Sequence, residues 1–120
     1  MTAALTALAA NLALELAPVR VNLIAARFVD TPLSASLLGD QLENRRHQLR
    51  ATLPIRRIVG PADVAALAAH IMINRALTGA TYDLDGGQQL VAGYRTMDQQ
   101  PARSTKGYDP ESILVYFMGE

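Results

Sequence analysis

The residues of this chain that could carry out chemistry are few, and their spacing does not bring them together. A tyrosine can act as a general acid or base when a nearby lysine lowers its pKa, but the only lysine is Lys106 and no tyrosine has a lysine four residues later. The two histidines, His47 and His70, have no partner at the spacing of zinc ligands, and there is no cysteine. None of the eight glycines fits the G-x-G-x-x-G pattern of a phosphate-binding turn. We therefore assign no catalytic residue and no metal ligand.

Charge and composition argue against a nucleic-acid partner. Eleven basic and eleven acidic residues give a formal net charge of zero, so no long-range field attracts nucleic acid or anionic lipid. The basic cluster contains five arginines without interleaved aromatic residues: Arg45, Arg46, Arg50, Arg56 and Arg57. Such a cluster is typical of a solvated surface, and we expect no nucleic-acid binding.

The apolar stretch near the start of the chain does not indicate a membrane protein. Ala7 to Leu16 is interrupted by Asn11 and Glu15, is too short to cross a bilayer and lacks the pattern of a signal peptide. We therefore expect no membrane partner. The absence of cysteine excludes a disulfide framework and fits a cytoplasmic location.

A helix followed by a buried strand is expected at the start of the chain. Residues 3–17 are rich in alanine and leucine and end before Pro18, which predicts a helix. Its apolar residues surround the axis, so we expect it to be covered on several sides. Val19 to Ala25 has only two polar interruptions, Arg20 and Asn22, and predicts a strand of a sheet that is covered on both faces.

The segment from Thr31 to Val59 predicts a connection with a helix of its own, either a surface helix or a lid. Asp40 and Glu43 have the spacing of a helix cap. Three leucines, Leu42, Leu49 and Leu53, form a thin apolar edge on this otherwise polar segment.

A second helix and a second strand follow. Gly60-Pro61 opens the helix, and Asp63 suits its first turn. One apolar face has helical spacing and should pack on a sheet: Val64, Leu67, Ala68, Ile71 and Met72. Ala80 to Leu84 then predicts a strand, and residues 85–87 a turn.

Two strands joined by a long helical connection imply a parallel pair with a right-handed crossover. Such a pair leaves both outer edges bare, which indicates that a preceding β-α-β region is missing. We assign residues 1–90 to this α/β unit and residues 91–120 to an extension. The extension is polar from Tyr94 to Asp109, which predicts flexibility, and its apolar run Ile113 to Met118 could form a strand or a short helix.

Three segments resemble the short-chain dehydrogenase/reductase family. They read LTALAANLALELAPVRVNLIAARFVDTPL at residues 5–33, GPADVA at residues 60–65 and LTGATYDLDGG at residues 77–87. The resemblance covers residues 3–90 and is to the C-terminal half of the family's doubly wound, Rossmann-type fold. It implies NAD(P)-dependent interconversion of alcohols and ketones, with NAD or NADP as cofactor. The family's glycine-rich turn, catalytic serine and Tyr-x-x-x-Lys pair would all precede this chain.

The resemblance also implies where the remaining part of a cofactor site would lie. Val29 and Thr31 match a family loop that holds the nicotinamide carboxamide and a nearby phosphate. Thr2 stands at the position of the family's lysine and cannot replace its charge. The Pro-Gly that precedes the loop in the family is replaced by Ala26-Arg27. Arg27 either reaches a phosphate or has drifted in a chain that no longer binds cofactor, and we favour drift.

Two functions remain open. The first is an oxidoreductase that is truncated and inactive alone, whose N-terminal half is lost or encoded separately upstream of Met1. The second is a non-catalytic oligomerisation module that pairs through its apolar helix and its strand edges. We expect a homo-oligomer in either case. The selector between NAD and NADP, like the substrate, would belong to the missing half.

Overall fold

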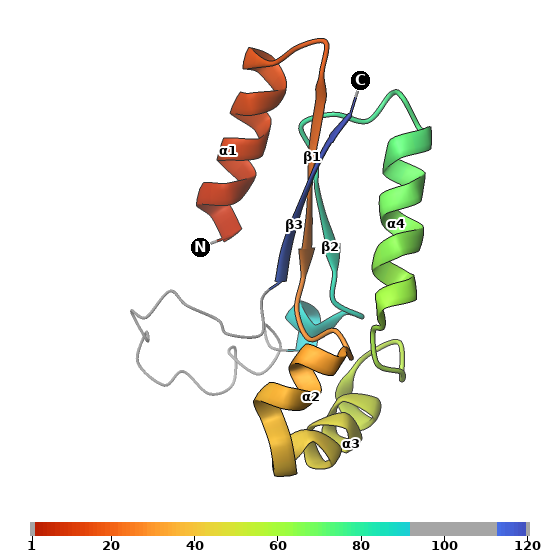
Figure 1. Ribbon diagram of the computed structural model, residues 1–120. Helices are drawn as coiled ribbons and strands as arrows, with labels where there is room; N and C mark the ends of the chain where they lie inside the picture. Colours follow the sequence, from red (N-terminus) through yellow and green to blue (C-terminus); the bar gives the residue numbers. More distant parts are fainter. Residues whose placement is uncertain (1, 92–112, 120) are drawn as a thin grey trace.

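The computed structural model describes residues 2–91 and 113–119 (Figure 1). In chain order the elements are α1 (Thr2–Glu15), β1 (Arg20–Ala26), α2 (Pro32–Leu38), a 3-10 turn (Gly39–Gln41), α3 (Leu42–Thr52), α4 (Pro61–Ile73), β2 (Thr81–Leu84) and β3 (Ile113–Gly119). The described strands form one sheet in the order β2-β1-β3. Helices α1 and α4 lie on opposite sides of this sheet, whereas α2 and α3 lie beyond the end of β1.

The parallel pair predicted from the sequence is confirmed. β1 pairs with β2 in parallel, from Leu23 opposite Thr81 to Ala26 opposite Leu84. The connection between them contains α2, α3 and α4, as a parallel crossover requires. The chain thus has the partial Rossmann-type α/β fold that its sequence predicts.

Alternate residues of β1 face the two helical layers, because successive side chains of a strand point to opposite faces. On one face, α1 packs its small side chains Ala9 and Ala13 against Val21 and Leu23. On the other face, Ile24 packs with Ala68 and Ile71 of α4. Val21, Leu23 and Ile24 have no exposed surface. The prediction that this strand is covered on both faces is confirmed.

Helix α1 is covered on one side only within the described part of the chain, unlike the expected coverage on several sides. Leu8, Leu14 and Leu16 keep 45%, 80% and 41% of their surface exposed. The helix ends at Glu15 rather than at residue 17. The apolar surround seen in the sequence therefore corresponds to one packed face and to leucines that are exposed elsewhere on the helix and just after its end.

The predicted cap at Asp40 and Glu43 is wrong. Asp40 lies in the 3-10 turn, and α3 starts after Gln41, whose backbone is helical and which makes no side-chain cap. A capping residue needs an extended backbone, which this continuous turn does not provide. The capping box lies instead at the start of α2, between Thr31 and Ser34.

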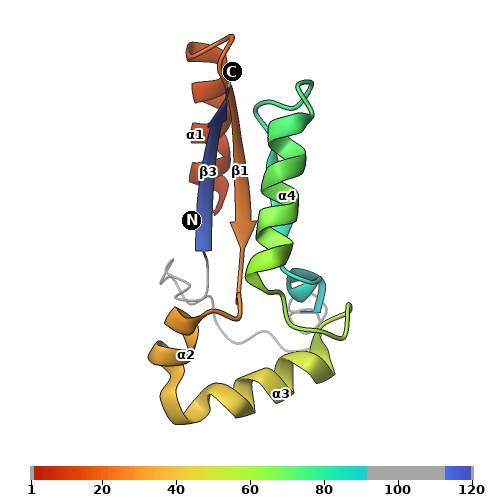
Figure 2. The ribbon, with the colours of Figure 1, turned by 45° about the vertical axis from the view of Figure 1, so that its right-hand side comes forward.

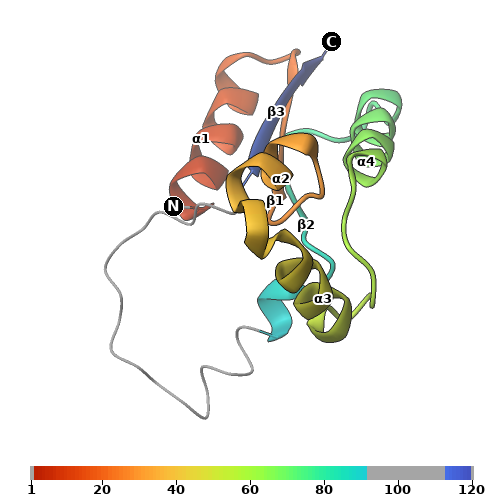
Figure 3. The same cartoon turned by 60° about the horizontal axis from the view of Figure 1, so that its bottom comes forward.

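The leucine edge predicted on this connection is confirmed, and it packs beneath the sheet. Leu49 and Leu53 are 2% and 3% exposed and form a cluster with Phe28, which follows β1. Leu42 packs against the same cluster. Figure 3 shows α2 and α3 beyond the ends of β1 and β2. This cluster holds the connection against the loop that follows β1.

Helix α4 begins as predicted, with Pro61 in its first turn and the Asp63 carboxylate accepting the Gly60 N–H at 2.9 Å. Ala68 and Ile71 are buried, and Val64 and Leu67 are partly buried in neighbouring clusters. The placement of Met72 on this face is wrong, because 54% of its surface is exposed. The apolar spacing extends to Met72, but the packed face of α4 ends at Ile71.

The extension adds a strand, which corrects the expectation of two bare edges. β3 pairs antiparallel with β1, and the two strands lie side by side (Figure 2). The described sheet is therefore mixed. The predicted flexible segment from Tyr94 to Asp109 lies outside the described residues.

Candidate functional site

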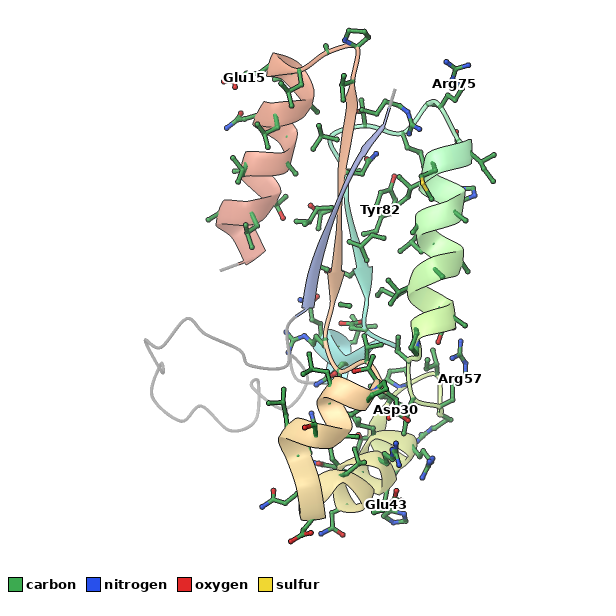
Figure 4. All side chains as sticks on the ribbon, viewed as in Figure 1. Glu15, Asp30, Glu43, Arg57, Arg75 and Tyr82 are labelled. Atoms are coloured by element: carbon green, nitrogen blue, oxygen red, sulfur yellow. The ribbon has the colours of Figure 1, made fainter. Side chains whose placement is uncertain are left out.

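The candidate site lies at the carboxyl ends of β1 and β2. In open α/β sheets, ligands bind outside this edge because loops with free backbone groups gather there. β1 leads into residues 27–31, and β2 leads into the turn Asp85-Gly86-Gly87. Figure 4 shows Asp30 and Arg57 near this end of the sheet. Both cofactor-binding residues assigned from the sequence, Val29 and Thr31, belong to the first loop.

Val29 fixes the loop from inside. It is 4% exposed and packs with Ala26 and Val59. Its carbonyl oxygen accepts a hydrogen bond from the Ser34 hydroxyl at 3.0 Å. A ligand at this loop would therefore meet the backbone of Val29 rather than its side chain.

Thr31 is held in one orientation by the capping box. Its N–H donates to Ser34 Oγ at 2.9 Å, and its Oγ1 accepts from the Ser34 N–H at 3.2 Å. The Thr31 hydroxyl proton has a longer contact, 3.4 Å to Ser34 Oγ. Because this contact is weak by its length, the hydroxyl can donate to a ligand oxygen at little cost.

An ion-pair network ties the loop to α3. Arg46 donates to Asp30 Oδ1 at 2.9 Å and to Glu43 Oε1 at 2.7 Å. The hydrogen bond with Asp30, followed by that with Glu43, raises the pKa of Arg46. The Asp30 N–H also donates to the Val59 carbonyl at 2.9 Å. Residues 29–31 are thus held from both sides, which is the rigidity that a binding loop requires.

Arg27 stands at the point where β1 passes into this loop, and it is partly buried. A glycine at this position would lack Cβ and would let a ligand approach the backbone more closely. The loop therefore has a hydroxyl donor at Thr31 and a cation at its start. Neither residue belongs to a glycine-rich turn of the kind that holds a pyrophosphate.

A hollow of about 460 Å³ lies at the end of β2, and one of its lining residues, Val59, packs against Val29 of the loop. Its walls include Pro54, Ile55 and Leu84, and the pair formed by Arg57 and Asp63 lies at its border. Its volume falls within the range of ligand pockets. A ligand there would meet apolar side chains, the Arg57–Asp63 ion pair and two further acidic residues, Asp83 and Asp85.

The turn after β2 depends on glycine for a steric reason. Gly87 has a φ of +88°, and a Cβ at this position would lie 2.6 Å from Cγ of Pro54. The Asp85 carboxylate accepts the N–H groups of Gly87 and Gln89 at 2.9 and 3.1 Å. The predicted turn is confirmed, and it closes one side of the hollow.

Two polar residues that looked like interruptions of β1 hold the opposite end of the sheet. The buried Asn22 side chain donates to the Leu77 carbonyl at 2.9 Å and accepts the Ala80 N–H at 3.3 Å. The Arg20 guanidinium donates to the carbonyls of Ile71, Met72, Asn74 and Leu77 at 2.8 to 3.2 Å. The signal in the sequence was two polar residues inside an apolar strand.

No pair of tyrosine and lysine occurs among the described residues. Tyr82 packs on the cluster of Ile24 and Ile71 beneath α4 and lies away from Asp30 (Figure 4). Lys106 lies outside the described residues. The side chains at the site therefore include no acid/base pair of the kind needed for hydride transfer to a carbonyl.

The arginine cluster is divided among separate contacts. Arg46 binds Asp30 and Glu43, Arg57 binds Asp63, and Arg56 donates to the Ala51 carbonyl. Within residues 2–91, no group of histidine, aspartate or glutamate side chains has the arrangement of a metal site. No helix in the described part of the chain has the length and apolarity needed to span a membrane.

Comparison with known proteins identifies the family. The sequence profile of a family described as enoyl-(acyl carrier protein) reductase matches residues 1–89. The chain is 34% identical over 80 residues to the short-chain dehydrogenase/reductase malC of Malbranchea aurantiaca. It is 32% identical over 96 residues to the oxidoreductase UcpA of Escherichia coli K12. A solved small-chain dehydrogenase in complex with NADPH matches 73% of this chain and 40% of its own, with 31% identity and a TM-score of 0.68. The chain belongs to the short-chain dehydrogenase/reductase family.

The chain spans about a third of the length of these relatives. The matched regions amount to 67% of this chain and 30% of malC, and to 73% of this chain and 36% of UcpA. The matched profile ends at residue 89, so β3 lies beyond it. The oxidoreductase resemblance seen in the sequence is thus confirmed for the family and for part of its domain.

From the ion pair between Arg57 and Asp63 we expect the folded chain to lose stability as the pH becomes acidic. Hydrogen bonds from Arg57, at 2.7 Å to each carboxylate oxygen, and then from the Gly60 N–H lower the pKa of Asp63 from 3.8 to about 2. A carboxylate with a lowered pKa in the folded state stabilises the fold above its unfolded pKa. This stabilisation is lost as the pH falls from about 4 towards 2.

Urea unfolding of the native chain and of Asp63→Asn should show this effect. The difference in the free energy of unfolding should shrink as the pH falls through that window. In the background of Arg57→Met, Asp63→Asn should change the pH dependence less, because the largest cause of the shift is absent. A native-to-variant difference that stays constant from pH 6 to pH 2 would contradict the assignment.

Proposed function

We propose that this chain supplies the nicotinamide side of an NAD(P)-dependent oxidoreductase and is inactive alone. The observation that carries this proposal is the rigid loop at residues 29–31, placed at the carboxyl end of β1 in a short-chain dehydrogenase/reductase fold. The family and the fold support the cofactor class. The chain itself provides neither a glycine-rich turn nor a Tyr-x-x-x-Lys pair.

When bound, the reduced cofactor would donate a hydride to a ketone, and the oxidised cofactor would accept a hydride from an alcohol. The Thr31 hydroxyl donates to the carboxamide or a phosphate oxygen of the cofactor, and the backbone of Val29 lines the nicotinamide end. Proton transfer requires a group from outside residues 1–91, because the described side chains at this edge include no paired acid and base.

The test uses a joined protein, in which residues 1–120 follow the part of E. coli UcpA that has no counterpart in this chain. The joined protein should oxidise secondary alcohols with NAD or NADP, whereas residues 1–120 alone should not. The reduced cofactor formed is measured by its absorbance. Turnover by the isolated chain at a rate similar to that of the joined protein would overturn the proposal. A folded joined protein without turnover or cofactor binding would overturn the assignment of the nicotinamide side.

Self-association is a second candidate function, and the exposed leucines of α1 favour it. Leu8 and Leu14 lie on α1, whose packed face uses alanines, and Leu16 follows the end of the helix. Burying this surface against a second copy would stabilise a dimer by about 25 cal/mol per Å² of apolar area, before the costs of association. We therefore propose a homo-oligomer that pairs through α1.

Leu8→Glu should weaken this association by at least about tenfold, because burying a carboxylate without a partner is unfavourable. Sedimentation equilibrium measures the dissociation constant. Leu37→Glu is the matched control, since it places the same charge on an exposed leucine of α2. A native chain that stays monomeric at high concentration, or a Leu8→Glu variant that associates as tightly as the native chain, would rule out this interface.

A further inference from the structure

The edge of β1 opposite β2 is fully occupied by β3. The pairing runs from Arg20 opposite Gly119 to Ala26 opposite Ile113, so it covers all seven residues of β1. β2 pairs with only four residues of β1. The strand outside the matched family segment therefore makes the longer of the two ladders.

The orientation of β3 is opposite to that of β2 on the same strand. In a doubly wound sheet the strands run parallel, and strands that follow one another in the second half of the chain are neighbours. The strand that precedes β1 in a complete domain would thus pair with the edge opposite β2. β3 occupies this edge in the antiparallel direction.

An unpaired edge at this position would be costly for β1. Without β3, the backbone N–H and C=O groups on this side of β1 would lose the partners that the antiparallel pairing gives them. Backbone N–H and C=O groups without partners are unfavourable when buried, and a bare edge pairs readily with other strands. The residues of β3, Ile-Leu-Val-Tyr-Phe-Met-Gly, carry no charge and have high strand propensity.

We infer that β3 blocks the edge of β1 to which the nucleotide-binding half of the oxidoreductase would bind. β3 competes with a parallel strand of that half for the same side of β1. This inference rests on the proposed function, because it takes that half as the competing partner. With β3 in place, the edge of β1 opposite β2 is closed to other strands. When the other half docks, β3 leaves the edge. The apparent affinity of the chain for that half is the intrinsic affinity multiplied by the fraction of chains in which β3 is not bound to β1.

Hydrogen exchange in the full chain, alone and in the joined protein, tests this competition. In the chain alone the amides of β3 that face β1 should be protected. In the joined protein they should exchange at least about 100-fold faster, because local opening controls their protection. Protected β3 amides in a joined protein that binds NADPH would overturn the inference and leave the proposed function intact.

The same experiment separates the remaining outcomes. Unprotected β3 amides in the chain alone would overturn the inference directly. Fast exchange of the β3 amides in a joined protein that binds no NADPH would support the competition between β3 and the other half and would contradict the proposed function. β3 amides that stay protected in a joined protein without NADPH binding would contradict both.

A pair of proline substitutions gives an independent test. Adjacent residues of a strand direct their N–H groups to opposite edges, so Leu114→Pro with Val115→Pro removes at least one bond to β1. In the chain alone this variant should expose β1 amides, whereas in the joined protein NADPH affinity should change less than about twofold. Leu114→Ile with Val115→Ile keeps both N–H groups and is the control. In the joined protein, the proline variant could lose more than about tenfold in NADPH affinity while the isoleucine control does not. This result would show that β3 belongs to the assembled sheet and would overturn the inference.

Discussion

Arg27→Gly should strengthen the binding of NADPH by the joined protein about tenfold. Glycine at the end of β1 removes a Cβ and lets the backbone approach a ligand closely, which the arginine side chain hinders. Isothermal titration calorimetry of the joined protein, with and without the substitution, measures the change.

Arg27→Ala distinguishes backbone approach from the loss of a charge. Alanine removes the guanidinium but keeps Cβ, so it should give a smaller gain than glycine. Weaker binding by both variants than by the parent would show that the Arg27 guanidinium holds a phosphate, contrary to our interpretation of this residue.

Asn22→Leu should destabilise the chain by about 3 kcal/mol. The substitution leaves the Ala80 N–H without its 3.3 Å acceptor and removes one of the two donors to the Leu77 carbonyl, which keeps the Arg20 guanidinium at 3.0 Å. Both groups lie in the connection from α4 to β2, so the parallel pair itself should loosen. Unfolding in urea, followed by circular dichroism, gives the free energy of unfolding.

Asn11→Leu provides the comparison for this effect, because Asn11 is an exposed residue of α1. It should change the stability by no more than about 0.5 kcal/mol. An Asn22→Leu chain as stable as the native chain would show that the two hydrogen bonds contribute nothing net.

The helices and strands with long apolar patterns could be predicted from the sequence. Residues 19–25 and 80–84 are bounded by helix breakers and turn residues, which fixes their length, and their parallel pairing follows from the long connection. The cap of α3 could not be predicted, because the spacing of Asp40 and Glu43 does not reveal that the backbone before α3 remains helical.

The third strand shows a different limit. Ile113 to Met118 fits a strand or a short helix equally well, since a short apolar run has no diagnostic period. Its choice of β1 as partner depends on an edge that exists only after α1, β1 and β2 have assembled. The exposure of leucines on α1 could not be predicted for a similar reason, because composition does not tell which faces of a helix pack against a neighbour.

The candidate site was predictable in position but not in detail. The family resemblance places Val29 and Thr31 in the loop after β1, and the structure confirms that position. That Ser34 fixes both residues, and that Arg46 holds Asp30 from α3, follows from contacts across the connection rather than from spacing. The roles of Val29 and Thr31 in cofactor binding remain a proposal.

Calorimetric titration of NADPH into residues 1–120 alone tests the central claim most directly. Under the proposed function the chain holds only the nicotinamide end of the cofactor, so no saturable binding is expected at micromolar concentrations. The joined protein measured in the same buffer should bind and serves as the positive control. Saturable micromolar binding by residues 1–120 alone would contradict the claim that the chain provides only the nicotinamide side.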